Sequence, residues 1–127
     1  MEGPVMIVAG FGFSSGASVS SLRDAYDRAA GEFDIALLAT AHDKARHIAF
    51  TDLANGLKLP ICAVAPKDLE TMHTRTRSAR SQSARNTGSV AEAAALAAAG
   101  PDARLVSARF ISDDRRATCA IAIGGAT

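Results

Sequence analysis

Short apolar runs alternate with amphipathic stretches through the first half of the chain. The apolar runs at residues 5–9, 33–39 and 59–64 have the length of buried strands. Residues 17–30 combine polar side chains with apolar ones spaced three and four apart, which predicts an amphipathic helix. Further helices are predicted at residues 43–55 and 66–72.

Helix boundary signals support this division. Gly31 and the pair Asn55–Gly56 are predicted to end the first two helices, and Gly100–Pro101 ends a later one. That later helix begins with Ser89 at the N-cap and Glu92 three residues on, the spacing of a capping box. A cap contributes about 1 kcal/mol, which accounts for Glu92 without a catalytic role.

The chain closes with two more apolar runs, at residues 104–110 and 117–123, separated by the polar turn 113–116. A short turn between strands predicts an antiparallel pair. We therefore expect an α/β fold: a single three-layer domain over residues 1–127, with a mixed, mostly parallel sheet of about five strands and helices on both faces.

The stretch AGFGFSSGAS at residues 9–18 follows the first predicted strand and leads into a helix. Backbone N–H groups at a helix start, together with serine hydroxyls, suit a carboxylate or phosphate. The stretch lacks the lysine of a Walker A motif and departs from the Rossmann spacing, so an ordinary strand-to-helix turn explains it equally well. The candidate ligand contacts are Gly10, Gly12, Ser14, Ser15 and Gly16.

Charged residues also follow the second predicted strand. Lys44 and His42 would lie near the carboxyl ends of the strands, where open α/β sheets bind ligands, although a solvated surface is the commoner outcome. His47, three residues after Lys44, is expected within the following helix and could share the face of Lys44. The histidines at 42, 47 and 73 have no paired carboxylates or cysteines beside them, so no metal site is predicted. No cofactor is predicted either.

Residues 71–89 contain four arginines and no acid, and we expect a long loop. Planar guanidinium groups suit carboxylates and phosphates, and a purely solvated loop is the alternative. RNA binding is less favoured because the segment has no aromatic residue for base stacking. The candidate ligand contacts here are Arg75, Arg77, Ser78 and Arg80, followed by Ser89 and Glu92.

Overall composition narrows the function classes. The net charge is +1, which favours neither nucleic acid nor an anionic membrane surface. No apolar run is long enough for a signal peptide or a membrane span, so we expect a cytoplasmic protein. Cys62 and Cys119 lie in apolar runs and are predicted to be buried free thiols. These features alone indicate a soluble α/β domain with a polyanion site.

Several segments, taken in order, resemble one family: residues 10–18, 39–44, 53–60, Ser78, 88–100 and 117–123. The sequence looks like the cobalamin biosynthesis family that joins CobE to the C-terminal domain of CbiG. The resemblance covers nearly the whole chain, and its most specific piece is GSVAEAAAL at residues 88–96. The resemblance implies an α/β fold and a place in the corrin-ring pathway.

The resemblance also implies site residues. The glycine loop of the family falls on Gly10, Gly12 and Gly16, its lysine on Lys44, its loop serine on Ser78 and its acid on Glu92. The family usually has a basic residue where Ser14 and Ser15 stand, and often an acid where His47 stands. These departures count against a hydrolase role.

Three functions follow as alternatives. The preferred one is a stand-alone, CobE-like protein that binds or carries a carboxylate-rich corrinoid or precorrin intermediate, with other pathway enzymes as partners. The second, implied by the resemblance to CbiG, is hydrolysis of a precorrin lactone with release of acetaldehyde; Glu92 and His47 are its weak catalytic candidates. The third is a nucleotide- or RNA-binding module. The oligomeric state is not predicted.

Overall fold

The computed structural model describes residues 6–72, 74 and 89–124. The first strand and helix are β1 (Met6–Phe13) and α1 (Val19–Ala30). The remaining elements follow in chain order: β2 (Leu37–Ala41), η1 (His42–Lys44), α2 (Ile48–Leu57), β3 (Ile61–Val64), α3 (Pro66–Thr71), α5 (Val90–Ala99), β4 (Arg104–Leu105), β5 (Phe110–Ile111) and β6 (Ala117–Gly124).

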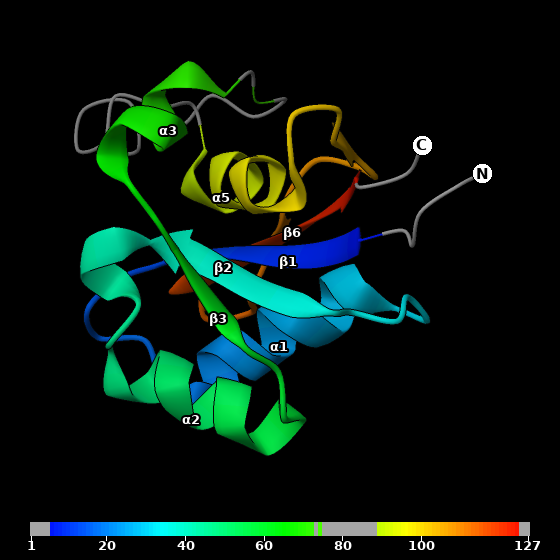
Figure 1. The fold of residues 1–127 in the computed structure, drawn as a ribbon. Coiled ribbons are helices and arrows are strands. Elements are labelled where there is room, and N and C mark those ends of the chain that lie inside the picture. The colour runs from blue at the N-terminus through cyan, green and yellow to red at the C-terminus, as the bar shows by residue number, and fades with distance from the viewer. Residues whose placement is uncertain (1–5, 73, 75–88, 125–127) are drawn as a thin grey trace.

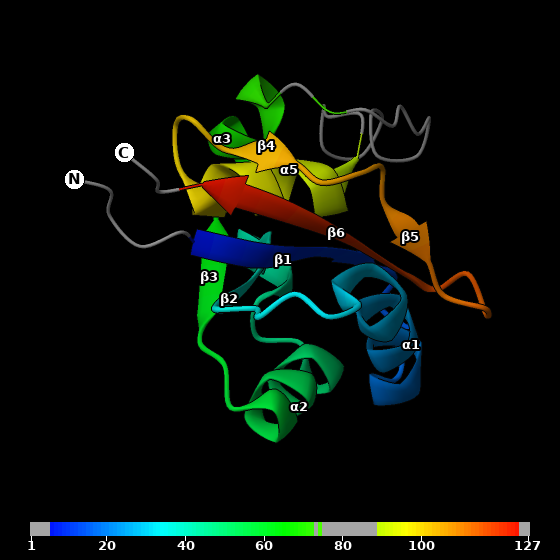
Figure 2. The ribbon, with the colours of Figure 1, turned by 90° about the vertical axis from the view of Figure 1, so that its right-hand side faces the viewer.

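These elements form a three-layer α/β domain around one mixed sheet (Figures 1 and 2). The strand order is β3-β2-β1-β6-β4, and β5 also pairs with β6. β1, β2 and β3 are parallel to one another, whereas β6 is antiparallel to β1, β4 and β5. The predicted fold class is confirmed, with six strands where about five were expected and with parallel and antiparallel pairs in similar measure.

The two faces of the sheet have separate apolar cores. α1 and α2 cover one face, where Phe11, Leu38 and Phe50 are buried. α3 and the alanine-rich α5 cover the other face, where Val8 and Leu69 are buried (Figure 2). Because side chains alternate along a strand, odd-numbered residues of β1 face α1 and α2, and even-numbered ones face α5.

Several predicted boundaries were wrong, and those of the second strand and second helix come first. The strand expected at 33–39 lies at 37–41, because the backbone N–H of Phe33 bonds the carbonyl of Ala30 and closes the end of α1. The helix expected at 43–55 divides into η1 and α2. α2 does not stop at Asn55–Gly56: it continues to Leu57, and Lys58 ends it in the left-handed region with φ 60°.

The strand expected at 104–110 splits into the two short strands β4 and β5. Between them, the backbone N–H of Arg109 bonds the side chain of Glu92 on α5 at 2.8 Å. That donor is turned toward the helix rather than toward β6. The predicted antiparallel pairing of the closing strands is nevertheless confirmed, since both short pieces pair antiparallel with β6.

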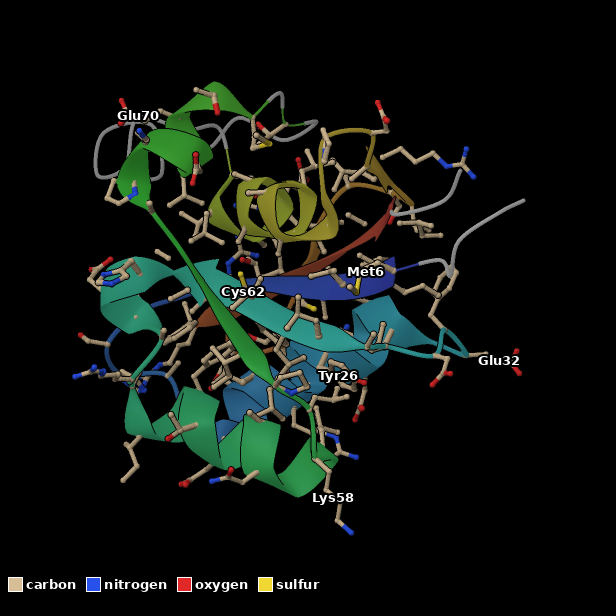
Figure 3. All side chains as sticks on the ribbon, in the orientation of Figure 1. Met6, Tyr26, Glu32, Lys58, Cys62 and Glu70 are labelled. Atoms are coloured by element: carbon tan, nitrogen blue, oxygen red, sulfur yellow. The ribbon has the colours of Figure 1, made fainter. Side chains whose placement is uncertain are left out.

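The two cysteines are free, as predicted. Cys119 is fully buried on β6, but Cys62 is only partly buried on the edge strand β3 (Figure 3). Burial raises the pKa of the Cys119 thiol well above its usual value and also raises the pKa of Cys62. Both thiols therefore stay protonated at neutral pH, which makes them weak nucleophiles.

Candidate functional site

The carboxyl ends of the three parallel strands meet at one edge of the sheet. α1, α2, α3 and α5 all begin at this edge, and the turn before β6 lies there too (Figure 1). Three segments therefore converge on it: the loop 14–18, the segment 42–47 and the turn 112–116. In open α/β sheets this edge is where ligands bind. We call it the carboxyl edge.

The loop 14–18 is held by the turn 112–116. Ser14 donates its backbone N–H to the carbonyl of Arg116 at 3.0 Å. The Arg116 guanidinium donates from Nη1 to the carbonyl of Gly16 at 3.1 Å. Ser18 then caps α1, and its hydroxyl accepts the backbone N–H of Ser21 at 3.1 Å. Arg116 is not among the predicted site residues, and its only sequence signal is its place in the polar turn before the last strand.

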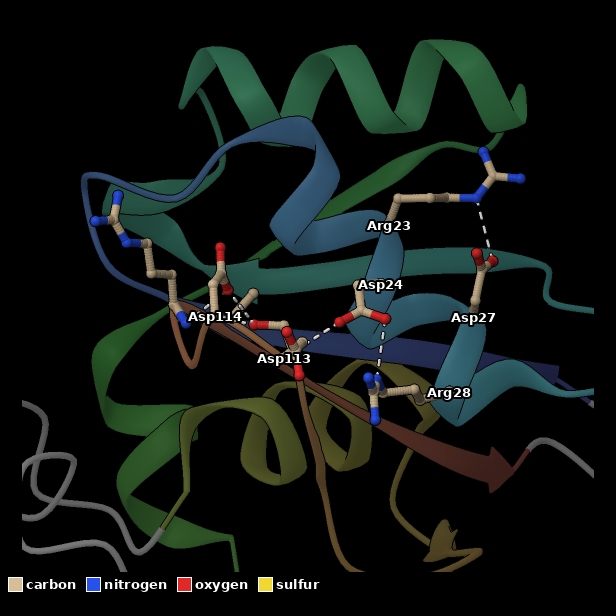
Figure 4. A network of polar contacts seen from close by, with 9 residues as sticks. Arg23, Asp24, Asp27, Arg28, Asp113 and Asp114 are labelled. Carbon is tan, nitrogen blue, oxygen red and sulfur yellow. Dashed lines mark hydrogen bonds and ion pairs between the residues drawn. The ribbon is translucent and has the colours of Figure 1, made fainter.

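A network of polar contacts fixes the turn itself to α1 (Figure 4). The Asp114 carboxylate accepts the hydroxyls of Ser112 and Ser21 and the backbone N–H of Arg116. These hydrogen bonds lower the pKa of Asp114 to about 2. Asp24 accepts the backbone N–H of Asp113, which is the main cause of its own lowered pKa. The turn is therefore tied to the helix at two carboxylates.

His47 joins the second segment to the loop. Its Nδ1 accepts the backbone N–H of Ala49 at 3.2 Å, so His47 is the N-cap of α2. Because Nδ1 accepts, the ring proton of the neutral imidazole is on Nε2, which lies 2.9 Å from the carbonyl oxygen of Ser15 and donates to it. His47 thus caps α2 with one ring nitrogen and positions the loop with the other.

Lys44 lies over an aromatic ring at this edge. Its Nζ is 5.4 Å from the ring centroid of Phe13, within cation–π distance. The ring is held by Phe50, stacked at 5.6 Å, and by the edge of His47 at 5.2 Å. The ion pairs found in the described residues join Arg23 to Asp27 and Arg28 to Asp24, so neither Lys44 nor Arg116 forms an ion pair there, although the Asp114 carboxylate interacts electrostatically with Arg116.

Two of the predicted loop glycines lie inside a strand. Gly10 and Gly12 are residues of β1, which does not end at Gly10 as expected because it pairs with β6 as far as Phe13. Both face α5: a Cβ on Gly10 would lie 2.2 Å from the carbonyl oxygen of Ala91, and one on Gly12 would lie 3.2 Å from Cβ of Val90. These glycines allow close helix–sheet packing. Gly16 alone of the three lies in the loop.

Ser89 and Glu92 are both fully buried at the start of α5. The Ser89 hydroxyl accepts the backbone N–H of Glu92 at 3.3 Å, which confirms Ser89 as the N-cap. Glu92 Oε2 accepts the backbone N–H of Arg109. Glu92 and His47 are on helices that cover opposite faces of the sheet, so the structure does not bring these two candidates together as a catalytic pair (Figure 2).

The remaining predicted contacts, Arg75, Arg77, Ser78 and Arg80, lie outside the described residues. Within residues 6–72, 74 and 89–124 there is no group of three His, Cys, Asp or Glu side chains that could hold a metal ion. No helix of that part of the chain is long and apolar enough to cross a membrane. A hollow of about 560 Å³ lies between α3, α5 and the loop before β4, and it is lined by Asp68, Met72, Leu96 and Arg104 among others.

Comparison with known proteins defines the class of this α/β domain. The family model described as "Cobalamin synthesis G C-terminus" matches residues 7–122. The chain therefore belongs to this family and is a cobalamin biosynthesis protein, and the resemblance found in the sequence is confirmed. No match was found among curated proteins.

Solved structures agree with this assignment. The structure of CobE, described as a protein from the cobalamin (vitamin B12) biosynthetic pathway, is 30% identical with a TM-score of 0.89, over 100% of this chain and 96% of that one. The cobalamin biosynthesis protein chiG from Agrobacterium tumefaciens is 36% identical with a TM-score of 0.66, over 92% and 97%. A cobalamin biosynthesis protein G homolog from Sulfolobus solfataricus shares the fold at 18% identity, with a TM-score of 0.69 over 95% of this chain and 37% of that chain.

Proposed function

We propose that this protein binds a carboxylate-rich corrinoid or precorrin intermediate at the carboxyl edge. The observation that carries the proposal is the Lys44 ammonium, which lies over Phe13 and forms no ion pair within the described residues. Intermediates of the corrin pathway are flat apolar macrocycles fringed with carboxylates. A fixed cation beside a polar loop suits one carboxylate of such a fringe.

The loop offers further donors to the same fringe. The hydroxyls of Ser14 and Ser15 and the backbone N–H groups of Ser15 and Gly16 belong to a loop that His47 and Arg116 hold in place. A loop fixed before binding loses less conformational entropy when the ligand arrives. Arg75, Arg77, Ser78 and Arg80, which were predicted as ligand contacts, remain part of the proposed site.

Binding is favoured over lactone hydrolysis by the hydrogen bonds and burial of the two acid–base candidates, His47 and Glu92. A general base needs an acceptor free to take a proton from water. Both ring nitrogens of His47 already form hydrogen bonds, one to the start of α2 and one to the loop. Glu92 is buried, and its carboxylate accepts a backbone N–H. No specific contact favours the nucleotide or RNA alternative.

The test is co-elution of pigment with the protein. Purified protein is mixed separately with hydrogenobyrinic acid and with earlier precorrin intermediates, passed over a desalting column and examined by visible absorbance. Unchanged pigment in the protein fraction supports the binding role. Chemically altered pigment, or acetaldehyde in the eluate, supports the hydrolase instead, and absence of pigment with every intermediate contradicts the proposal.

A matched pair of variants locates the site. Lys44→Gln removes the cation at the carboxyl edge. Lys58→Gln removes a cation at the far end of α2, where Lys58 points away from the molecule (Figure 3). The proposal requires Lys44→Gln to retain less pigment than the unchanged protein and Lys58→Gln to retain the same amount.

A further inference from the structure

Ile48 is an unusually exposed apolar side chain. It is 73% exposed, whereas the other exposed large hydrophobic residues in the described ranges are 37% to 40% exposed. Exposure of an isoleucine side chain to water is unfavourable relative to its burial. Single exposed apolar residues are common on protein surfaces, so the meaning of this one depends on what lies beside it.

Ile48 lies at the carboxyl edge and is adjacent in sequence to residues of the candidate site. Ile48 is the first residue of α2 and directly follows His47, which bonds the loop at Ser15 and contacts the Phe13 ring. The Lys44 ammonium lies over the same Phe13 ring. Phe13 is partly exposed and contacts protein groups, whereas Ile48 is far more open to solvent. Val19, the first residue of α1, is 39% exposed at the same edge.

We propose that Ile48 is the apolar contact for the ring face of the bound intermediate, with Val19 as a lesser contact. This inference rests on the proposed function and deepens it. An amphipathic anion needs an apolar surface and a cation at adjacent positions. Lys44 offers the cation, and Ile48 offers the surface four residues later along the chain. The ring then lies across the start of α2, with a carboxylate directed to Lys44.

Ile48→Ser tests the inference, with Phe33→Ser as the matched control. Phe33 is 40% exposed in the loop between α1 and β2, at the opposite edge of the sheet. Hydrogenobyrinic acid is titrated into each variant and followed by its visible absorbance. Ile48→Ser is expected to weaken binding about tenfold, which corresponds to partial burial of one isoleucine, and Phe33→Ser to leave binding unchanged.

Two further measurements separate a ring contact from a structural effect. Ile48→Leu restores an apolar side chain and is expected to bind as the unchanged protein does. The salt dependence of binding by Ile48→Ser should equal that of the unchanged protein, because no charge is removed. Equal affinity of Ile48→Ser and the unchanged protein, or equally weak binding by Ile48→Leu, overturns the inference while leaving the proposed function intact. Absence of binding by the unchanged protein overturns both.

Discussion

The Nε2 atom of His47 lies 2.9 Å from the carbonyl oxygen of Ser15. This contact joins the segment after β2 to the loop after β1, two parts of the chain that are 32 residues apart. The same imidazole caps α2 through Nδ1. One side chain thus fixes a helix start and the backbone of the candidate site together.

His47→Ala is expected to loosen both. Loss of a helix cap costs about 1 kcal/mol, which lowers Tm by about 4 °C in a domain of this size. Binding of hydrogenobyrinic acid should weaken as well, because the loop is no longer held before the ligand arrives. His42→Ala is the control, since the side chain of His42 makes no hydrogen bond among the described residues. Unchanged Tm and binding in His47→Ala would show that the contact has no positioning role.

Gly10→Ala should be strongly destabilising. The new Cβ would lie 2.2 Å from the Ala91 carbonyl oxygen and 2.5 Å from the Ala95 nitrogen, both of them backbone atoms that cannot move without shifting α5. Overpacking of this kind costs about 1–3 kcal/mol or more.

Gly56→Ala is the matched control for that substitution. A Cβ on Gly56, inside α2, meets nothing within 4 Å. Alanine is a better helix former than glycine by about 1 kcal/mol, so Gly56→Ala should raise Tm while Gly10→Ala lowers it. Thermal unfolding followed by circular dichroism measures both. A similar Tm for the two variants would contradict the assignment of Gly10 to helix–sheet packing.

These glycines show how far the sequence could be interpreted. The alternation of apolar runs and helices predicted the layers, and Ser89, Gly31 and Gly100 marked helix ends correctly. Local signals of this kind act over a few residues. The continuation of β1 past Gly10 depends instead on pairing with β6, more than a hundred residues later. The glycine-rich stretch by itself therefore predicts a loop where the strand continues.

The candidate site could be predicted only in part, because some of its contacts join residues far apart in the sequence. His42 and Lys44 belong to η1, which follows β2 directly, so the rule for parallel strands placed them at the carboxyl edge. His47 was expected only to share the face of Lys44. Arg116 reaches that edge through a contact with Gly16, 100 residues away. Nothing local in the sequence indicates that contact, nor that the Glu92 carboxylate bonds Arg109.

Asp114 should make stability depend on acid pH. Its pKa is about 2 in the folded protein against an ordinary value of 3.8. A lowered folded pKa means that the ionised carboxylate stabilises the fold above about pH 4, and that this contribution is lost as the pH falls toward 2. Asp114→Asn should therefore lower Tm at pH 7, and the difference from the unchanged protein should shrink between pH 4 and pH 2. Asp52→Asn, at an exposed position of α2, is the control. A constant difference across that range would assign the effect to geometry rather than charge.

Lys58→Gly should stabilise the end of α2. Lys58 has φ 60°, a left-handed conformation that is strained for residues with a Cβ and free of strain for glycine. The relief is about 1 kcal/mol, partly offset by the greater freedom of glycine in the unfolded chain. Urea unfolding should show a higher midpoint with an unchanged slope. A lower midpoint would mean that the lysine side chain contributes more than the strain costs.

Lys44→Gln and Arg116→Gln should each weaken binding of hydrogenobyrinic acid at low ionic strength. An exposed cation that pairs with one ligand carboxylate contributes roughly 1 kcal/mol, so each substitution should cost about fivefold in affinity. For Lys44→Gln the difference should nearly vanish in about 1 M salt, where charges are screened within about 3 Å. Lys58→Gln, at the far end of α2, should bind like the unchanged protein at every salt concentration.

Arg116→Gln also removes the contact with Gly16, so its loss of affinity should persist in part at high salt, whereas that of Lys44→Gln should not. Losses in Lys44→Gln that are equal at low and high salt would show that Lys44 acts through Phe13 and the fold rather than through its charge on the ligand.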